Sequence, residues 1–346
     1  MPAAGRDYPG SYAELLEWFS DDAACLDYLE WLRWPEGFRC PRCAGREGWR
    51  LSSGRWECAV CGRQTSVTAG TIFHRSRTPL RMWFAAAWLM TSQKQGVSAL
   101  GVQRVLGLGS YQTAWAMMHR FRVAMVRPDR ERLNGHVEVD EAYVGGVEGK
   151  VYGRETATKS IVAIAVEIEN PKGFGRIRLQ RVPDVSKDSL IPFIEAAVEP
   201  GATVHTDGWQ AYWTVPEHGY THERTVMRQQ DDPAHVVMPG VHRVASLLQR
   251  WLLGTYQGRV SPEHLDAYLN EFTFRFNRRR SRRRGLLFYR LLEQAIATDP
   301  VTYRSLVANP SPTGRRPAHA SNPGRVATVP AVQRPWRENT GETPAT

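Results

Sequence analysis

The first third of the chain carries apolar residues at the three-to-four-residue spacing of amphipathic helices, interrupted by polar and glycine-rich breaks. Over residues 11–34 this period predicts two short helices, because the polar run Ser20-Asp-Asp22 breaks the apolar face. Either Ser20 or Asp21 would cap the second helix, since a short polar side chain there can accept a backbone N–H.

Three further helices are expected between residues 79 and 127. Pro79 suits the first turn of the first helix. The other two, near 97–106 and 110–126, are separated by Gly107-Leu-Gly-Ser110, in which a glycine can end one helix and the serine can cap the next. A short helix, a tight glycine turn and a second helix form helix-turn-helix geometry, an arrangement used to bind DNA.

The pattern changes after residue 136, where alternating or continuous apolar stretches predict strands. Strands are expected at 136–144, 159–168, 175–182, 202–206 and 222–227, and helices at 186–197, 208–215, 242–253 and 262–279. Three hairpin-like strands, then helix, strand, helix, strand and helix, is the order of an RNase H-like α/β domain, a mixed sheet with flanking helices. From about residue 300 the chain is polar, rich in Pro and Arg and without periodicity, which predicts disorder.

Composition adds a bias towards polyanionic partners. The 346 residues include 45 Lys+Arg against 35 Asp+Glu, a formal charge of +10, which favours nucleic acid. The sequence contains no apolar run long enough for a membrane span and no signal-peptide stretch at its start. We therefore expect a cytoplasmic protein in a reducing compartment, where cysteines bind metal more often than they form disulfides.

Four of the five cysteines form two CxxC pairs. Cys40-Pro-Arg-Cys43 and Cys58-Ala-Val-Cys61 are separated by 14 residues. Each pair places two thiolates on one tight turn, and two such turns give a tetrahedral four-sulfur site that suits a structural Zn²⁺. Disulfides and buried free thiols are the alternatives, and the paired spacing disfavours both. Cys25 lies on an apolar helical face and is expected in the core.

These patterns divide the chain into five segments. They are an N-terminal helical segment (1–36), a zinc ribbon (37–75), a helical DNA-binding region (76–130), an RNase H-like catalytic domain (131–295) and a disordered basic, Pro-rich tail (296–346).

Two aspartates and a histidine are candidates for a catalytic metal site. Asp140 lies in the first predicted strand, Asp207 closes the fourth, and His242 opens a helix after 34 intervening residues. Carboxylates converging at a sheet can hold the divalent ions used for phosphoryl transfer on DNA, with Mg²⁺ or Mn²⁺ preferring hard oxygen ligands. Each residue also has an ordinary interpretation: a polar strand residue for Asp140, a helix cap for Asp207 and a hydrogen-bonding helix start for His242.

A dense run of arginines follows the last predicted helix of this domain. We expect these residues, together with two on the His242 helix, to contact DNA phosphates, although a solvated charged face is the alternative. The set comprises Arg243, Arg250, Arg275, Arg278, Arg279, Arg280, Arg282, Arg283 and Arg284.

Several motifs in order carry a resemblance to a known family. Besides the CxxC pairs, they are Thr68-Ala-Gly-Thr-Ile-Phe73, Val137-Glu-Val-Asp-Glu-Ala-Tyr-Val-Gly-Gly146, Val204-His-Thr-Asp-Gly-Trp-Gln-Ala-Tyr212, Gly254-Thr-Tyr-Gln-Gly258 and Tyr268-Leu-Asn-Glu-Phe-Thr-Phe-Arg-Phe-Asn-Arg-Arg279. Over about residues 10–290 the chain resembles insertion-sequence transposases that join an N-terminal zinc ribbon to an RNase H-like DDE domain.

The resemblance implies that Asp140 and Asp207 are catalytic acids. The position that commonly holds glutamate in the family holds His242 here, and an imidazole prefers softer ions than Mg²⁺. Other residues that could take the third role are Glu223, Asp231 and Asp232.

As implied by the resemblance, the protein is a DNA transposase that binds the inverted repeats of its element. It would cut and transfer strands to target DNA with Mg²⁺ or Mn²⁺, as a homo-oligomer associated with the nucleoid. The alternative is a catalytically inactive DNA-binding protein derived from a transposase.

Overall fold

The computed structural model describes residues 2–308 except 128, 146–155, 157, 170–172, 227–233 and 259. The described chain forms two compact units. The first joins the residues up to Met125 to Ser281–Ala308, and the second consists of Val126–Arg280. In the part of the chain that is described, no helix combines the length and apolar character needed to cross a membrane.

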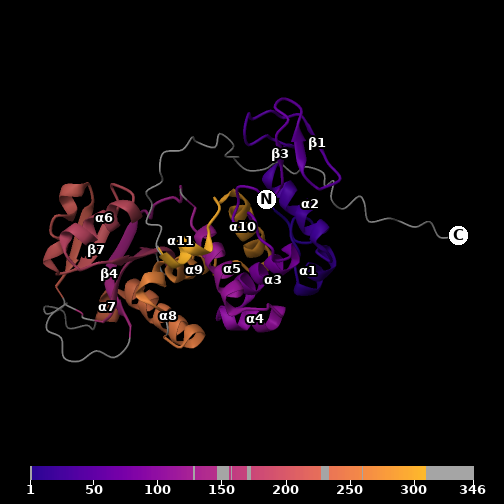
Figure 1. Cartoon of the computed structure of the whole chain (residues 1–346). Helices are drawn as coiled ribbons and strands as arrows, with labels where there is room; N and C mark the ends of the chain where they lie inside the picture. The colour runs from indigo at the N-terminus through magenta and orange to yellow at the C-terminus, as the bar shows by residue number, and fades with distance from the viewer. Residues whose placement is uncertain are drawn as a thin grey trace. The chain divides into compact units, whose positions relative to one another are not determined.

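The first unit is mainly helical. Its helices are α1 (Tyr12–Trp18), α2 (Asp22–Arg33), α3 (Leu80–Ser92), α4 (Ala99–Leu106), α5 (Tyr111–Ala124), α10 (Arg284–Ala297) and α11 (Tyr303–Ala308) (Figure 1). Phe288 of α10 is fully buried, with its ring centroid 5.8 Å from that of Phe84 and 5.6 Å from that of Trp88 in α3. Gly285 allows this docking, because a Cβ there would lie 1.9 Å from the carbonyl oxygen of Pro9.

The predicted helix ends at Asp21, Gly107 and Ser110 are confirmed, whereas Pro79 is the N-cap of α3 and does not lie in its first turn. Asp21 caps α2 by accepting the Ala24 N–H at 2.8 Å, and Ser110 caps α5 by accepting the Thr113 N–H at 3.1 Å. Gly107 ends α4 with a φ of 62°, a left-handed conformation that glycine adopts without steric cost. Helices α4 and α5 therefore have the expected helix-turn-helix connection.

The cysteine-rich segment of the first unit is a small antiparallel sheet. Its strands are β1 (Gly48–Arg50), β2 (Trp56–Cys58) and β3 (Gln64–Thr65), with β2 in the middle. Phe38 stacks on Trp56 at 4.9 Å between ring centroids, and Trp34 packs edge-on against both. Such a small core leaves most of the segment's stability to be supplied by a bound metal.

The second unit is built on a mixed five-stranded sheet. Its strands are β4 (His136–Val144), β5 (Ser160–Ile168), β6 (Phe174–Val182), β7 (Thr203–Asp207) and β8 (Thr221–Thr225), in the order β6-β5-β4-β7-β8. Pairing is antiparallel from β6 to β4 and parallel from β4 to β8. This mixed sheet, flanked by helices, is the predicted RNase H-like architecture.

Helices cover the two faces of the sheet. Helix α6 (Lys187–Ala197) packs on one face against Val137, Val139 and Val204. Helices α8 (Pro239–Tyr256) and α9 (Leu265–Phe276) pack on the other, against Ala142 and Val162, with the short α7 (Ala234–Val237) preceding α8 (Figure 1). Successive residues of a strand face opposite sides, so odd positions of β4 face α6 and even positions face α8.

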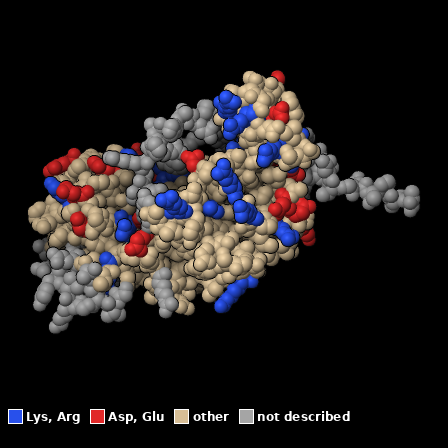
Figure 2. Space-filling model, in the orientation of Figure 1, with Lys and Arg blue, Asp and Glu red and all other residues tan. Residues whose placement is uncertain are grey.

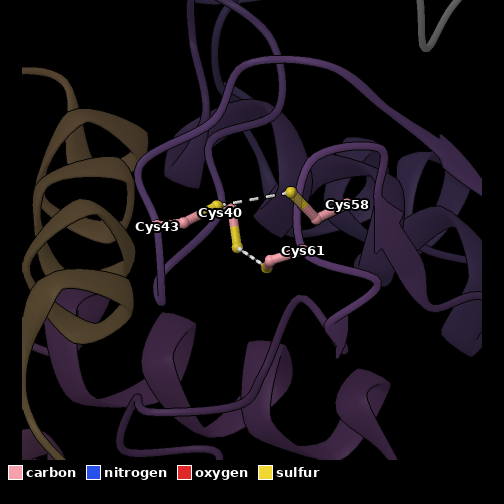
Figure 3. Close-up of side chains that lie close together, drawn as sticks. All are labelled: Cys40, Cys43, Cys58 and Cys61. Atoms are coloured by element: carbon pink, nitrogen blue, oxygen red, sulfur yellow. Dashed lines mark hydrogen bonds between the residues drawn. The ribbon is translucent and has the colours of Figure 1, made fainter.

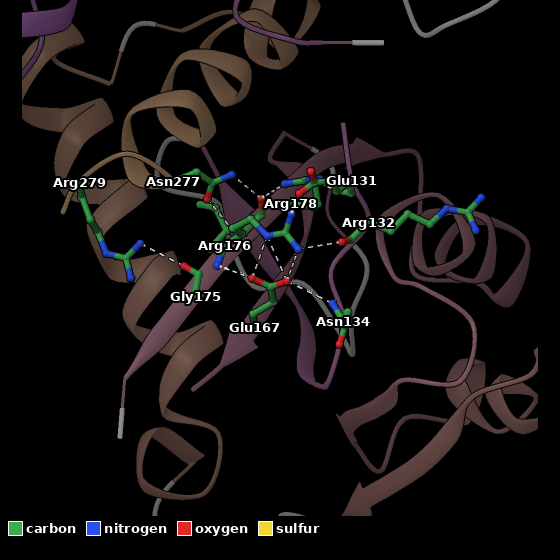
Figure 4. A network of polar contacts seen from close by, with 10 residues as sticks. Glu131, Arg132, Asn134, Glu167, Gly175, Arg176, Arg178, Asn277 and Arg279 are labelled. Atoms are coloured by element: carbon green, nitrogen blue, oxygen red, sulfur yellow. Dashed lines mark hydrogen bonds and ion pairs between the residues drawn. The ribbon is translucent and has the colours of Figure 1, made fainter. Parts of the chain in front are cut away.

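An asparagine secures the edge strand β6. Asn277, just after α9, accepts the Ile177 N–H at 2.8 Å and donates to the Ile177 carbonyl at 3.2 Å, as a neighbouring strand would (Figure 4). Arg279 donates to the carbonyl of Gly175 at 3.1 Å. On the same strand, Arg176 forms an ion pair with Glu167 at 2.7 Å. The free edge is thus blocked and tied to α9.

Three further expectations differ from the structure. The helix predicted at 208–215 is replaced by two 3₁₀ turns, η1 (Gln210–Tyr212) and η2 (Val215–His218), because Asp207 accepts the Trp209 N–H at 3.0 Å in a local turn. A third 3₁₀ turn, η4 (Pro262–His264), precedes α9.

The other two differences concern the C-terminal region. Helix α10, within the segment expected to end the catalytic domain, packs in the first unit. Helix α11 forms within the segment expected to be disordered. The rest of the predicted tail, from residue 309, lies outside the described residues.

Candidate functional site

The four predicted zinc ligands come together in the first unit. Their sulfur atoms all lie within 4.8 Å of one another, with 3.7 Å between Cys40 and Cys61 and 3.6 Å between Cys43 and Cys58 (Figure 3). Tetrahedral Zn²⁺ with bonds of about 2.3 Å needs sulfurs about 3.8 Å apart, so the cluster fits the ion. Cys25 is buried in α2, and burial holds the pKa of its thiol well above the usual range.

Asp140 and Asp207 occupy corresponding positions on neighbouring parallel strands. Strands β4 and β7 pair with a constant offset from His136 beside Thr203 to Glu138 beside His205. The same offset of 67 residues (203 − 136) carried forward places Asp140 beside Asp207. Because paired residues share a face, both aspartates lie on the α8 side of the sheet, opposite the face on which Val137 and Val204 are buried.

A buried tyrosine hydroxyl contacts the acidic residue that follows Asp140 in β4. The Tyr212 hydroxyl donates to Glu141 Oε1 at 2.5 Å. Burial raises the pKa of Tyr212 well above its usual value, and the negative charges of Glu141, Asp140 and Asp207 raise it further. Both predicted catalytic acids therefore lie within electrostatic range of one protonated hydroxyl. Oxygen donors of this kind suit Mg²⁺ or Mn²⁺.

The start of α8 is fastened to the same strand. Glu138, two residues before Asp140 on the same face, is buried and accepts the Val241 N–H at 3.0 Å. Gly240 makes this approach possible, since a Cβ there would lie 2.9 Å from Glu138 Oε2. A carboxylate at a helix N-terminus is also stabilised by the helix dipole. His242 follows Val241 directly, so Glu138 fixes the backbone that carries it.

The alternatives for the third ligand are placed differently. Glu223 lies in β8 beside His205, and its Oε2 is 2.9 Å from His136 Nε2. Asp231 and Asp232 lie outside the described residues. Among the described residues, the Cys₄ set and the trio His136, His205 and Glu223 are the groups of three or more potential ligands within metal-binding distance of one another.

Sequence reasoning missed five residues of this region: Glu138, Glu141, Tyr212, His136 and His205. Glu138 occupies a position in β4 that faces a helix, where an apolar residue is the norm, and that break in the pattern was the available signal. Tyr212 lay in a motif already noted, yet its contact with Glu141 spans 71 residues and has no local signature.

The predicted DNA-binding arginines divide into two groups. Several bind the second unit itself: Arg278 and Arg279 lie over the rings of Phe274 and Phe276, and Arg280 forms an ion pair with Glu169 at 2.6 Å. Arg275 Nη1 lies 3.7 Å from Oε1 of the buried Glu271. Arg280 is exposed despite its ion pair with Glu169, as are Arg243, Arg250, Arg282, Arg283 and Arg284.

Basic side chains are also prominent elsewhere on the first unit. On the face drawn in Figure 2, Lys and Arg side chains gather over its helices and ribbon, with fewer acidic ones among them. Fixed cations of this kind favour contact with a polyanion.

Part of each unit is similar to a transposase family. Residues 132–277 match the ISXO2-like transposase domain, and residues 20–64 match the transposase zinc-ribbon domain. A protein described as uncharacterized in the transposable element ISH50 of Halobacterium salinarum is 28% identical over 278 residues, which cover 74% of this chain and 91% of that protein. Among solved structures, the catalytic core domain of BIV integrase matches 40% of this chain and 81% of its own, with 16% identity and a TM-score of 0.27.

Proposed function

Because the chain belongs to the insertion-sequence transposases that join a zinc ribbon to an ISXO2-like transposase domain, we propose that it cuts and transfers DNA strands at the ends of its own element. The observation that carries the proposal is the placement of Asp140 beside Asp207, on the face that receives the start of α8. The register of the parallel strands β4 and β7, continued by two residues, supports the proposal that these carboxylates act together.

Divalent cations held by Asp140 and Asp207, with His242 as the third ligand, would supply charge neutralisation for the attacking and leaving oxygens. The chain's own residues keep this arrangement in place. Tyr212 stays protonated and holds Glu141 on the α6 side of β4, next in the chain to Asp140, while Glu138 fixes the turn that presents His242.

The proposed reaction has two steps with the same in-line geometry. In cleavage, water attacks a phosphorus at the element end, the bond to the 3′ oxygen breaks, and a 3′-OH and a 5′-phosphate result. In transfer, that 3′-OH attacks a target phosphodiester and displaces a new 3′-OH, so the number of phosphodiester bonds is unchanged and no energy source is required.

DNA recognition is proposed to use the first unit and the exposed arginines. The helix-turn-helix of α4 and α5 and the zinc ribbon would bind the inverted repeats, and Arg243, Arg250 and Arg282–Arg284 would hold phosphates. Two element ends must meet in one reaction, so we propose that the active form is a homo-oligomer.

Strand cleavage on a labelled duplex containing the element end tests the catalytic proposal. With Mg²⁺ or Mn²⁺ we expect 3′-OH products from the natural chain and none from Asp140→Asn or Asp207→Asn. Asp188→Asn, an exposed residue of α6, is the control and should cleave normally. Normal cleavage by either site variant would remove that residue from the mechanism.

The substitution of histidine for the usual third acid favours a second candidate, a DNA-binding protein that has lost cleavage. It would bind the same duplex as tightly but yield no product with either ion, and the gene would lack intact inverted repeats and flanking target duplications.

A further inference from the structure

A second cluster of metal-binding side chains lies on the sheet of the second unit. One donor atom each from His136, His205 and Glu223 lies within 4.8 Å of the other two. His136 is the first residue of β4, His205 lies in β7, and Glu223 lies beside His205 in β8. Three adjacent parallel strands therefore each contribute one ligand.

Strand register explains why the three side chains meet. His136 pairs with Thr203, two residues before His205, and His205 pairs with Glu223, so all three point to the α8 side of the sheet. The rings of His136 and His205 are 5.6 Å apart, and His136 Nε2 is 2.9 Å from Glu223 Oε2. No long or mobile segment is needed to form the group.

The cluster is distinct from the proposed catalytic pair. His136 is four residues before Asp140, which is about 13 Å along a strand. Its chemistry also differs, because two imidazoles and one carboxylate select borderline transition ions, whereas Mg²⁺ prefers oxygen donors alone.

A second interaction supports the ligand role of His205. Its Nε2 lies 2.8 Å from the Thr225 hydroxyl, two residues after Glu223 on β8. Ligating histidines are commonly held by such a partner on one nitrogen while the other binds the ion. Coordination through Nδ1 would preserve this hydrogen bond.

We propose that His136, His205 and Glu223 bind one divalent transition-metal ion, of the Zn²⁺, Ni²⁺ or Co²⁺ class. The ion clamps β4, β7 and β8 together through two imidazoles and a carboxylate and leaves positions for water. It is a site separate from the zinc ribbon and independent of strand transfer.

The test uses the full-length, untagged, zinc-loaded chain carrying Asp140→Asn and Asp207→Asn, so that ions at the proposed catalytic pair do not contribute. Ni²⁺ is added, and bound nickel is measured by equilibrium dialysis with elemental analysis, and its affinity by calorimetry. We expect one saturable Ni²⁺ per chain beyond the ribbon zinc. His136→Ala and Glu223→Gln should each weaken Ni²⁺ affinity by more than about tenfold. Loss of a residue that only supports a ligand already costs about tenfold in metal affinity, so loss of a ligand should cost more.

His218 provides a matched control. Its Nδ1 is 2.8 Å from Glu195 Oε1, with exposures of 34% and 51%, against 33% and 56% for His136 and Glu223. His218→Ala should leave Ni²⁺ binding unchanged. Circular dichroism of each variant confirms folding.

Co²⁺ gives an independent readout. Co²⁺ bound by His136, His205 and Glu223 should show weak absorption bands in the visible range. It should not show the thiolate charge-transfer absorption of a cysteine site. Absence of a saturable Ni²⁺, or equal affinity in His136→Ala, Glu223→Gln and the parent, would overturn the assignment and leave an ordinary ion pair beside a neutral histidine.

Discussion

Glu138 in the middle of β4 accepts the backbone N–H of Val241 at 3.0 Å, and this hydrogen bond joins the first turn of α8 to the strand that carries Asp140. The contact spans 103 residues of sequence. Because His242 follows Val241 in the chain, this hydrogen bond fixes the backbone of His242 relative to the sheet.

Replacing Glu138 with alanine should destabilise the second unit. The change leaves the buried Val241 N–H without an acceptor, which costs about 1–3 kcal/mol in the free energy of unfolding. Urea unfolding followed by circular dichroism measures the loss. Glu199→Ala, an exposed residue of the same unit, is the control and should change stability by less than about 0.5 kcal/mol.

Glu138→Gln should separate charge from shape, because the amide oxygen can still accept from Val241. Burial raises the pKa of Glu138 above the usual value of a glutamate, although the Val241 and Gly240 N–H groups oppose the shift. A raised folded-state pKa means that stability from this group is present below the unfolded pKa and is lost as pH rises through the folded pKa. The glutamine variant should therefore lose less stability than the natural chain as the pH rises above the unfolded-state glutamate pKa of about 4.3. Equal changes of stability with pH in the two proteins would contradict this prediction.

Exchanging His242 for glutamate should change the metal preference of strand cleavage. A neutral imidazole adds no negative charge and favours softer ions, so the natural chain should prefer Mn²⁺ over Mg²⁺ more strongly than His242→Glu does. Initial cleavage rates with each ion give the ratio, and His218→Glu serves as the control. Equal ratios in the natural chain and His242→Glu would exclude His242 as a ligand.

The five thiols should respond differently to zinc removal. Metal protects the four ribbon thiols, whereas burial protects Cys25 by keeping the pKa of its thiol high. After chelation, alkylation followed by intact mass spectrometry should show four added groups per native chain, and all five of the cysteines once the chain is unfolded. Rapid alkylation of the four before chelation would argue against a bound ion.

Loss of the Asn277 side chain should open the edge of the sheet. In Asn277→Ala both polar groups of Ile177 lose their partner, so the Ile177 amide should exchange its hydrogen faster. Asn277→Asp keeps the acceptor for that N–H and should exchange more slowly than the alanine variant. Hydrogen exchange of peptides spanning β6 provides the measurement, and identical exchange in all three proteins would show that the edge is secured by other contacts.

Local patterns predicted the elements of the second unit because each strand carries its own signature. The apolar alternation of 136–144 coincides with β4, and the other strands begin and end within two residues of their predicted ranges. The four-cysteine site followed from spacing, since CxxC turns place their own sulfurs.

Contacts between distant segments could not be read in this way. Docking of α10 depends on Gly285 meeting Pro9, and the position of Glu138 depends on Val241. The meeting of His136, His205 and Glu223 requires the strand order, which no local pattern encodes. The helix expected at 208–215 failed because the Asp207 side chain turned the backbone before a helical turn could start.

The first unit is formed by two separate stretches of the chain, and this affects when it can fold during synthesis. Its final core helix, α10, is made only after all of residues 126–280 have left the ribosome, whereas the sheet unit is continuous and can fold as soon as it emerges. Until α10 has been synthesised, Phe84 and Trp88 cannot make their ring contacts with Phe288. A chain that ended at Arg280 would contain every strand of the five-stranded sheet. It would lack α10, so the first unit could not complete its core.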